Sequence, residues 1–170
     1  SPDPVELGEW NHMAVTYDAD SEAIVLYVNG EAKADGTVGT TPFSELHLGQ
    51  RASTMNYPFN GGLDHVAIYN RALSSDEIGQ LVSKDSVDEG LLVLWDMNET
   101  TGMTLADTAG GNANWIEGHM EGGLQLDGEY VSVSDLPDVT STTWAAWVRL
   151  DEEANYSAAI SAAFDGAGAG

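Results

Sequence analysis

The chain of 170 residues carries 28 acidic residues against 5 basic ones, a formal net charge of −23. Such a surface repels nucleic acid and anionic membranes, so both are disfavoured as partners. No apolar run approaches the ~18 residues of a membrane span, which argues against membrane insertion, and the lack of cysteine excludes disulfides and thiolate metal sites. The acidic excess is typical of halophilic adaptation or of a calcium-rich extracellular setting.

The first part of the chain alternates apolar and polar residues with period two, which predicts β-strands. Strands are expected at 12–17 and at 23–28. The pair Asn29-Gly30 after the second strand is a strong hairpin signal, because both residues accept positive φ. Further strands of this part are predicted at residues 31–33, 46–48 and 63–69.

One short helix is predicted after these strands. Ser74 and Glu77 have the spacing of a capping box, in which each residue satisfies a backbone N–H of the other. The apolar stripe of the helix consists of Leu73, Ile78, Leu81 and Val82. Residues 84–90 are polar, acidic and without a pattern, so we interpret them as a linker.

The remaining part of the chain again predicts short strands separated by turn-rich loops. These strands are expected at residues 91–95, 123–126, 130–133 and 143–148. Many short strands, one short helix and glycine-rich turns favour an all-β fold, a two-sheet antiparallel sandwich with one short helix.

Several motifs, taken in order, resemble a laminin-G-like jelly roll of the concanavalin A-like lectin/glucanase superfamily. Residues 1–83 resemble its second half through Trp10–Asp18, Leu26–Gly30, Leu48-Gly49, Phe59–Asp64 and Ile68–Ser74. Residues 91–170 resemble its first half through Leu94-Trp95 with Asn98-Glu99, Asp107–Gly110, Leu124–Gly128 with Tyr130-Val131, and Trp144–Val148. The two halves therefore stand in permuted order, joined by the linker at 84–90.

The permuted order leaves two ways to complete the sandwich. The halves pair within one chain, in which case the strand at 63–69 lies beside the segment 91–97, or they pair with copies in adjacent subunits. Read cyclically from Val148 to Trp10, about two strands of the usual pattern are missing, which would leave sheet edges unpaired.

The resemblance also extends to glucanases, whose catalytic strand carries alternating carboxylates. No Glu of this chain is followed by Asp two positions later. The histidines His12, His47, His65 and His119 are scattered and lack metal-binding spacing. We therefore predict that the protein is not an enzyme, and a glycosidase-related fold is the most distant alternative.

The resemblance implies a structural calcium ion where the first and last strands meet, held by an Asp side chain and backbone carbonyls. The matching carboxylate is Asp64. Other candidate ligands are Asn98, Asp107, Asp127 and Gly128. The alternative is that these aspartates only make turn hydrogen bonds to backbone N–H groups.

Aromatic residues in asparagine-rich loops are candidates for sugar stacking. Trp115 follows Asn114 in one predicted loop, and Tyr57 lies in another. The alternative is a loop anchored by one buried ring. Asn98 and Asn155 each begin an N-glycosylation triplet.

These features together predict a non-catalytic extracellular recognition or adhesion module from a larger secreted or cell-surface protein. Its partner would be carbohydrate or a cell-surface glycoprotein. The alternative is a structural tandem module of a surface layer or filament, which assembles with neighbouring copies through strand exchange.

Overall fold

The protein was analysed as a computed structural model, which describes residues 5–39, 43–49, 58–98, 114–128, 130–133, 139–152 and 159–164. The first part contains β1 (Trp10–Asp18), β2 (Ala23–Val28), β3 (Glu31–Thr37), β4 (Phe43–Leu48), β5 (Asn60–Tyr69) and helix α1 (Ser75–Val82). The second part contains β6 (Leu91–Trp95), β7 (Asn114–Glu117), β8 (Gly122–Asp127), β9 (Val131–Val133), β10 (Thr142–Leu150) and β11 (Ile160–Phe164).

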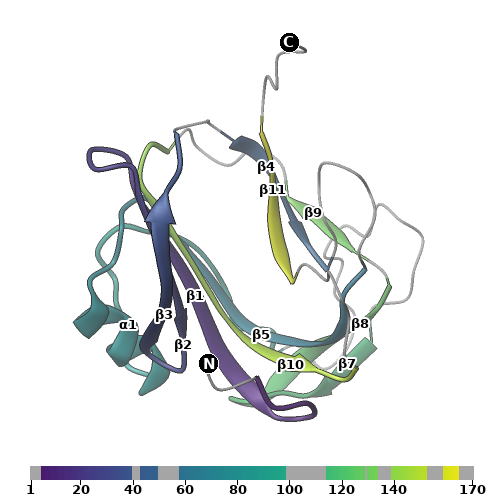
Figure 1. Ribbon diagram of the computed structural model, residues 1–170. Helices are drawn as coiled ribbons and strands as arrows, with labels where there is room; N and C mark the ends of the chain where they lie inside the picture. Colours follow the sequence, from purple (N-terminus) through teal and green to yellow (C-terminus); the bar gives the residue numbers. More distant parts are fainter. Residues whose placement is uncertain are drawn as a thin grey trace.

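The strands form two antiparallel sheets. The larger sheet has eight strands in the order β3-β2-β1-β10-β5-β8-β7, with β6 also paired to β5. The smaller sheet has three strands in the order β11-β4-β9. Figure 1 shows the smaller sheet across the concave side of the larger one, with α1 on the other side. The all-β jelly-roll sandwich expected from the sequence is confirmed.

Both parts of the chain contribute strands to both sheets. In the larger sheet β10 lies between β1 and β5, and in the smaller sheet β4 lies between β11 and β9. The expected neighbour of 63–69 is present, because Val66 of β5 is opposite Trp95 of β6. Segment 84–90 packs against the sandwich: Val87 is buried, and the Gly90 carbonyl accepts a 2.8 Å hydrogen bond from the Asn70 N–H.

Two local predictions are confirmed in detail. Asn29 and Gly30 have φ values of 50° and 83° and turn the chain from β2 into β3. Ser74 and Glu77 form the capping box at the start of α1, with each side chain accepting from the other's backbone N–H. The helix therefore begins where the sequence places it, and Ile78 and Leu81 face the sheet as buried residues.

Two strands were not predicted. Trp115 was expected in a loop, which is wrong: Asn114–Glu117 forms β7, and Trp115 lies opposite Leu124 of β8. β11 at Ile160–Phe164 was missed as well, and it pairs with β4. Both strands have five residues or fewer, too short for an alternating pattern to stand out, and their pairing with longer strands decides their conformation.

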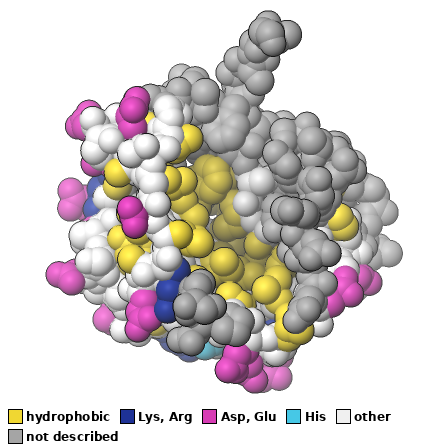
Figure 2. Space-filling view, in the orientation of Figure 1, with side chains coloured by type: hydrophobic (Ala, Val, Ile, Leu, Met, Phe, Trp, Pro, Cys, Tyr) yellow, Lys and Arg dark blue, Asp and Glu magenta, His cyan; other side chains and the backbone are white. Residues whose placement is uncertain are grey.

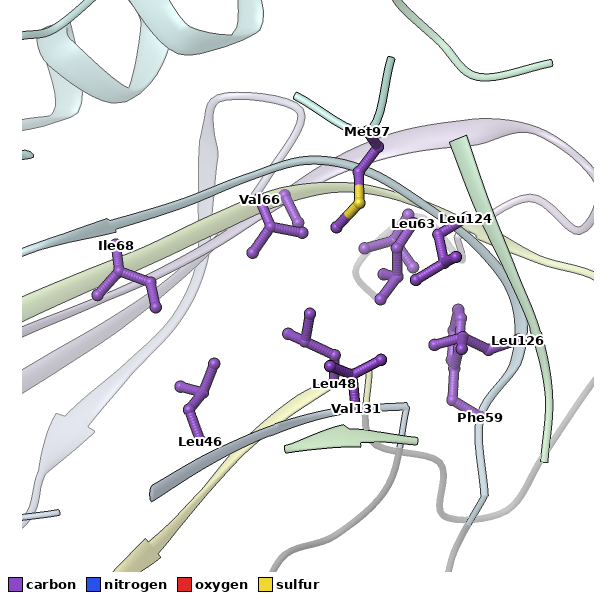
Figure 3. Packing of buried hydrophobic residues seen from close by; sticks show 12 residues of the cluster. Leu46, Leu48, Phe59, Leu63, Val66, Ile68, Met97, Leu124, Leu126 and Val131 are labelled. Carbon is purple, nitrogen blue, oxygen red and sulfur yellow. The ribbon is translucent and has the colours of Figure 1, made fainter. Parts of the chain in front are cut away.

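Apolar side chains form one cluster on each face of the larger sheet. The inner cluster, between the two sheets, contains Leu46, Leu48, Phe59, Leu63, Val66, Ile68, Met97, Leu124, Leu126, Val131, Ala146 and Val148. Figure 3 shows side chains of β5 and β8 directed towards those of β4 and β9. The outer cluster, under α1, contains Ala14, Tyr27, Ala67, Tyr69, Leu73, Ile78, Leu81, Val87 and Ala145.

Candidate functional site

Asp64 lies where strand β5 changes its partner. Residues 60–63 of β5 pair with β8, whereas residues 66–69 pair with β6. At this fork His65 has a positive φ of 49°, and the register with β10 shifts between Ala145 and Trp147. Asp64 directly follows Leu63 of the inner cluster and therefore lies on the outer face of the sheet, where its side chain is completely buried.

The Asp64 carboxylate is only partly satisfied by hydrogen bonds. Its Oδ2 accepts a 2.8 Å hydrogen bond from the Met120 N–H. Its Oδ1 is buried and has no hydrogen-bond partner among the described residues. Burial raises the pKa of Asp64, while backbone N–H groups of Met120, His119 and His65 lower it. A buried carboxylate with an unsatisfied oxygen is stabilised by a cation or by a further donor.

Glycine allows the turn between β7 and β8 to approach this carboxylate closely. A Cβ atom on Gly118 would lie 2.8 Å from Asp64 Oδ2 and 1.8 Å from the Gly122 carbonyl oxygen. A Cβ atom on Gly122 would lie 2.4 Å from the Met97 carbonyl oxygen. The side-chain oxygen of Asn98 accepts a 3.2 Å hydrogen bond from the Gly122 N–H. The turn between β7 and β8 therefore brings the Gly122 carbonyl oxygen to the region of Asp64, and the segment after β6 packs against Gly122.

Three histidines that are distant in sequence gather around the same region. His119 stacks on Trp147 with 3.6 Å between ring centroids, and His12 contacts Trp147 edge-on at 5.4 Å. His65 Nδ1 lies 3.3 Å from an Asp96 carboxylate oxygen. Burial, with help from the charges of His65 and His119, lowers the pKa of His12 to about 4. The positions of these histidines along the chain did not predict the cluster. They come together because the strand order of the larger sheet brings β1, β5 and the β7–β8 turn close to one another.

The histidine cluster does not form a metal centre with acidic side chains. Within the part of the chain that the structure describes, no group of three or more His, Cys, Asp or Glu side chains is placed to hold a metal ion. Near the fork the structure instead places the Asp64 carboxylate, the Gly122 carbonyl and, against the Gly122 N–H, the side-chain oxygen of Asn98. Oxygen ligands of this kind suit calcium.

Two of the other predicted calcium ligands, Asp127 and Gly128, lie at the end of β8. Asp127 ends β8 opposite Asn60, four residues before Asp64 along β5. Gly128 has a φ of 89°, and its N–H donates to the Phe59 carbonyl at 3.4 Å. Asp107 falls outside the described residues. Of the predicted set, the structure brings Asn98 into the surroundings of Asp64, through Gly122.

The predicted sugar-binding residues are placed in part. Asn114 is exposed at the start of β7, at the end of the larger sheet. Trp115 is half-buried and packs against the inner cluster, so much of its ring contributes to packing. Tyr57 and the glycosylation candidate Asn155 lie outside the described residues.

Comparison with known families agrees with this fold. Residues 1–79 match a laminin-G family model described as the concanavalin A-like lectin/glucanases superfamily. The resemblance is confirmed for this part of the chain. The match covers β1 to β5 and reaches into α1, so it includes Asp64. Comparisons with curated proteins and with solved structures gave no match.

The laminin-G-like match accounts for the part of the chain predicted as the second half of a jelly roll. A lectin-like or other binding module is the general class that this fold supports. Among the described residues, no helix has the length and apolar character needed to cross a membrane.

Proposed function

We propose that this chain is a non-catalytic recognition module of a secreted or cell-surface protein, with carbohydrate or a surface glycoprotein as its partner. The observation that carries the proposal is the match of residues 1–79 to a laminin-G-like, concanavalin A-like family on a jelly-roll sandwich. Glycosidases need two cooperating carboxylates. Asp64 is the one fully buried acidic side chain among the described residues, and a backbone N–H occupies its Oδ2.

The proposed carbohydrate site lies on β7, which is the last strand of the larger sheet. The exposed Asn114 offers an amide that both donates and accepts hydrogen bonds to sugar hydroxyls. The half-buried Trp115 points to the opposite face of β7, so its ring could stack on an apolar sugar face only around the exposed edge of this last strand. Packing against the inner cluster holds that ring rigidly, which lowers the entropy cost of binding.

A glycan array probed with the whole chain tests this proposal. We expect binding to a defined group of glycans and a loss of about tenfold in affinity for Asn114→Ala, which corresponds to about 1.4 kcal/mol. Glu117→Ala is the matched control, because Glu117 is also exposed on β7. Absence of glycan binding would contradict the carbohydrate partner, and equal losses for the two variants would contradict the site.

We also propose that a calcium ion stabilises the fork at Asp64. The unsatisfied Asp64 Oδ1 and the Gly122 carbonyl in the adjacent turn support this proposal. The ion would supply the positive charge that a buried carboxylate lacks, and Asn98 would contribute a neutral oxygen. Its role would be to hold the β7–β8 turn against β5, with no part in a reaction.

Thermal unfolding with and without a chelator tests the ion. An ion present at 100 times its dissociation constant adds about 2.7 kcal/mol to the free energy of unfolding. We expect the chelator to lower the melting temperature and Asp64→Asn to abolish this sensitivity. Asp127→Asn is the control, since Asp127 is exposed at the far end of β8. Identical melting curves with and without chelator would exclude a stabilising ion.

A further inference from the structure

The inner face of the larger sheet is unevenly covered, because eight strands face a smaller sheet of three described strands. Five large apolar side chains of β1 and β2 belong to neither described core cluster: Val15, Tyr17, Ile24, Leu26 and Val28. All five are half-buried. We call these five residues the open face.

The strand register places the open face on the inner side. Val15 is opposite Leu26 on β2 and opposite Trp144 on β10, and Trp144 packs against the inner cluster. The alternate residues Ala14 and Tyr27 belong to the outer cluster under α1. Figure 2 shows hydrophobic side chains at the bottom of a hollow on this side of the molecule.

One polar atom of the open face lacks a partner. Tyr17 Oη is buried and makes no hydrogen bond with any described residue. A buried hydroxyl without a partner costs free energy. The open face therefore contains half-buried apolar side chains and one buried hydroxyl without a partner among the described residues.

The acidic charge of the segment that carries the open face favours a basic partner. The segment that carries it, residues 5–39, holds seven acidic residues and one lysine: Glu6, Glu9, Asp18, Asp20, Glu22, Glu31, Asp35 and Lys33. Lys33 is itself paired with Glu31 at 2.8 Å. A second copy of this chain would bring another net charge of −23 to the contact and be repelled. A partner with basic residues is attracted.

We propose that the open face binds an apolar β-strand of another polypeptide, flanked by Lys or Arg residues. The strand lies over β1 and β2 as an extension of the smaller sheet, with its apolar side on Leu26 and Val15. Period-two alternation gives such a strand one apolar face, and sheets pack about 10 Å apart in a sandwich. This docking surface is separate from the carbohydrate and calcium proposals and does not depend on either.

A designed peptide tests the inference directly. The probe is a fluorescent peptide of about ten residues in which valine and threonine alternate, with two lysines at each end. We expect saturable binding that weakens as ionic strength rises, because salt screens the acidic segment. Two control peptides have the same core flanked by glutamates and the same residues reordered to helical period. Equal binding of the glutamate-flanked peptide would contradict the preference for basic residues. Equal binding of the peptide with helical period would contradict recognition of a β-strand.

Two substitutions on the edge strand β3 locate the site. Ala34 lies opposite Leu26, on the inner side, whereas Ala32 lies opposite Tyr27, on the outer side, and both alanines are exposed. Ala34→Arg places a cationic side chain beside the open face, and Ala32→Arg makes the same change of charge away from it.

We expect Ala34→Arg to weaken peptide binding at least about tenfold and Ala32→Arg to change it less than about twofold. Equal effects of the two variants would overturn the site. A dimer of the free protein that Ala34→Arg dissociates would overturn the assignment to a basic strand, since the occupant would then be a second copy.

Discussion

The inner face of the larger sheet has a closed region around Leu63 and an open region around Leu26. Both regions are formed by apolar side chains of strands that pair within the same sheet. Leu63 is completely buried in the inner cluster beneath the smaller sheet, whereas Leu26 is half-buried and belongs to neither cluster. An apolar face therefore stabilises the fold only where a second layer covers it, and elsewhere it is available to a partner.

The largest expected effect is a contrast between two leucine truncations. Leu63→Ala should lower the free energy of unfolding by about 2–5 kcal/mol, because it leaves a cavity in a packed core. Leu26→Ala should lower it by about 1 kcal/mol, because less apolar area is removed from contact. Equilibrium unfolding in urea measures both values, and similar losses would show that the open region is packed as tightly as the closed one.

Acid should weaken β1, the strand that carries part of the open face on one side and His12 on the other. The pKa of His12 falls from 6.5 to about 4 in the folded protein. Because the pKa of His12 is lower in the folded protein, protons bind the unfolded chain more readily at this residue. The free energy of unfolding therefore has its full value above pH 6.5 and decreases as pH falls towards 4. The full loss is about 3 kcal/mol.

Urea unfolding between pH 7 and pH 4 measures this dependence. His12→Gln should flatten it, because the variant has no imidazole to protonate, and the remaining slope then reports the other titrating groups. A slope unchanged by His12→Gln would mean that folding does not lower the pKa of His12.

A smaller effect is expected at the helix that closes the outer face. Ser74→Ala removes the side chain that caps the Glu77 N–H and should cost about 1 kcal/mol. Ser75→Ala is the control, since Ser75 is exposed in the first turn and does not form the cap. Urea unfolding of the two variants should separate them, and the result would be contradicted if Ser75→Ala cost as much as Ser74→Ala.

The sequence alone determined the features that depend on neighbouring residues. The hairpin at Asn29-Gly30 and the start of α1 at Ser74 follow from local backbone preference and capping. The order of the motifs was sufficient to indicate the jelly roll. These predictions hold because each depends on a few adjacent side chains or on the alternation of a long strand.

The tertiary structure decided everything that depends on which strands become neighbours. Trp115 joins a strand because Leu124 pairs with it, and His12 meets His119 because β1 and β10 are adjacent. Alternation places Leu63 and Leu26 on the same face of the sheet, but it carries no information about what lies across from each. Burial is a property of two layers together, so only the arrangement of the strands separates the closed region from the open one.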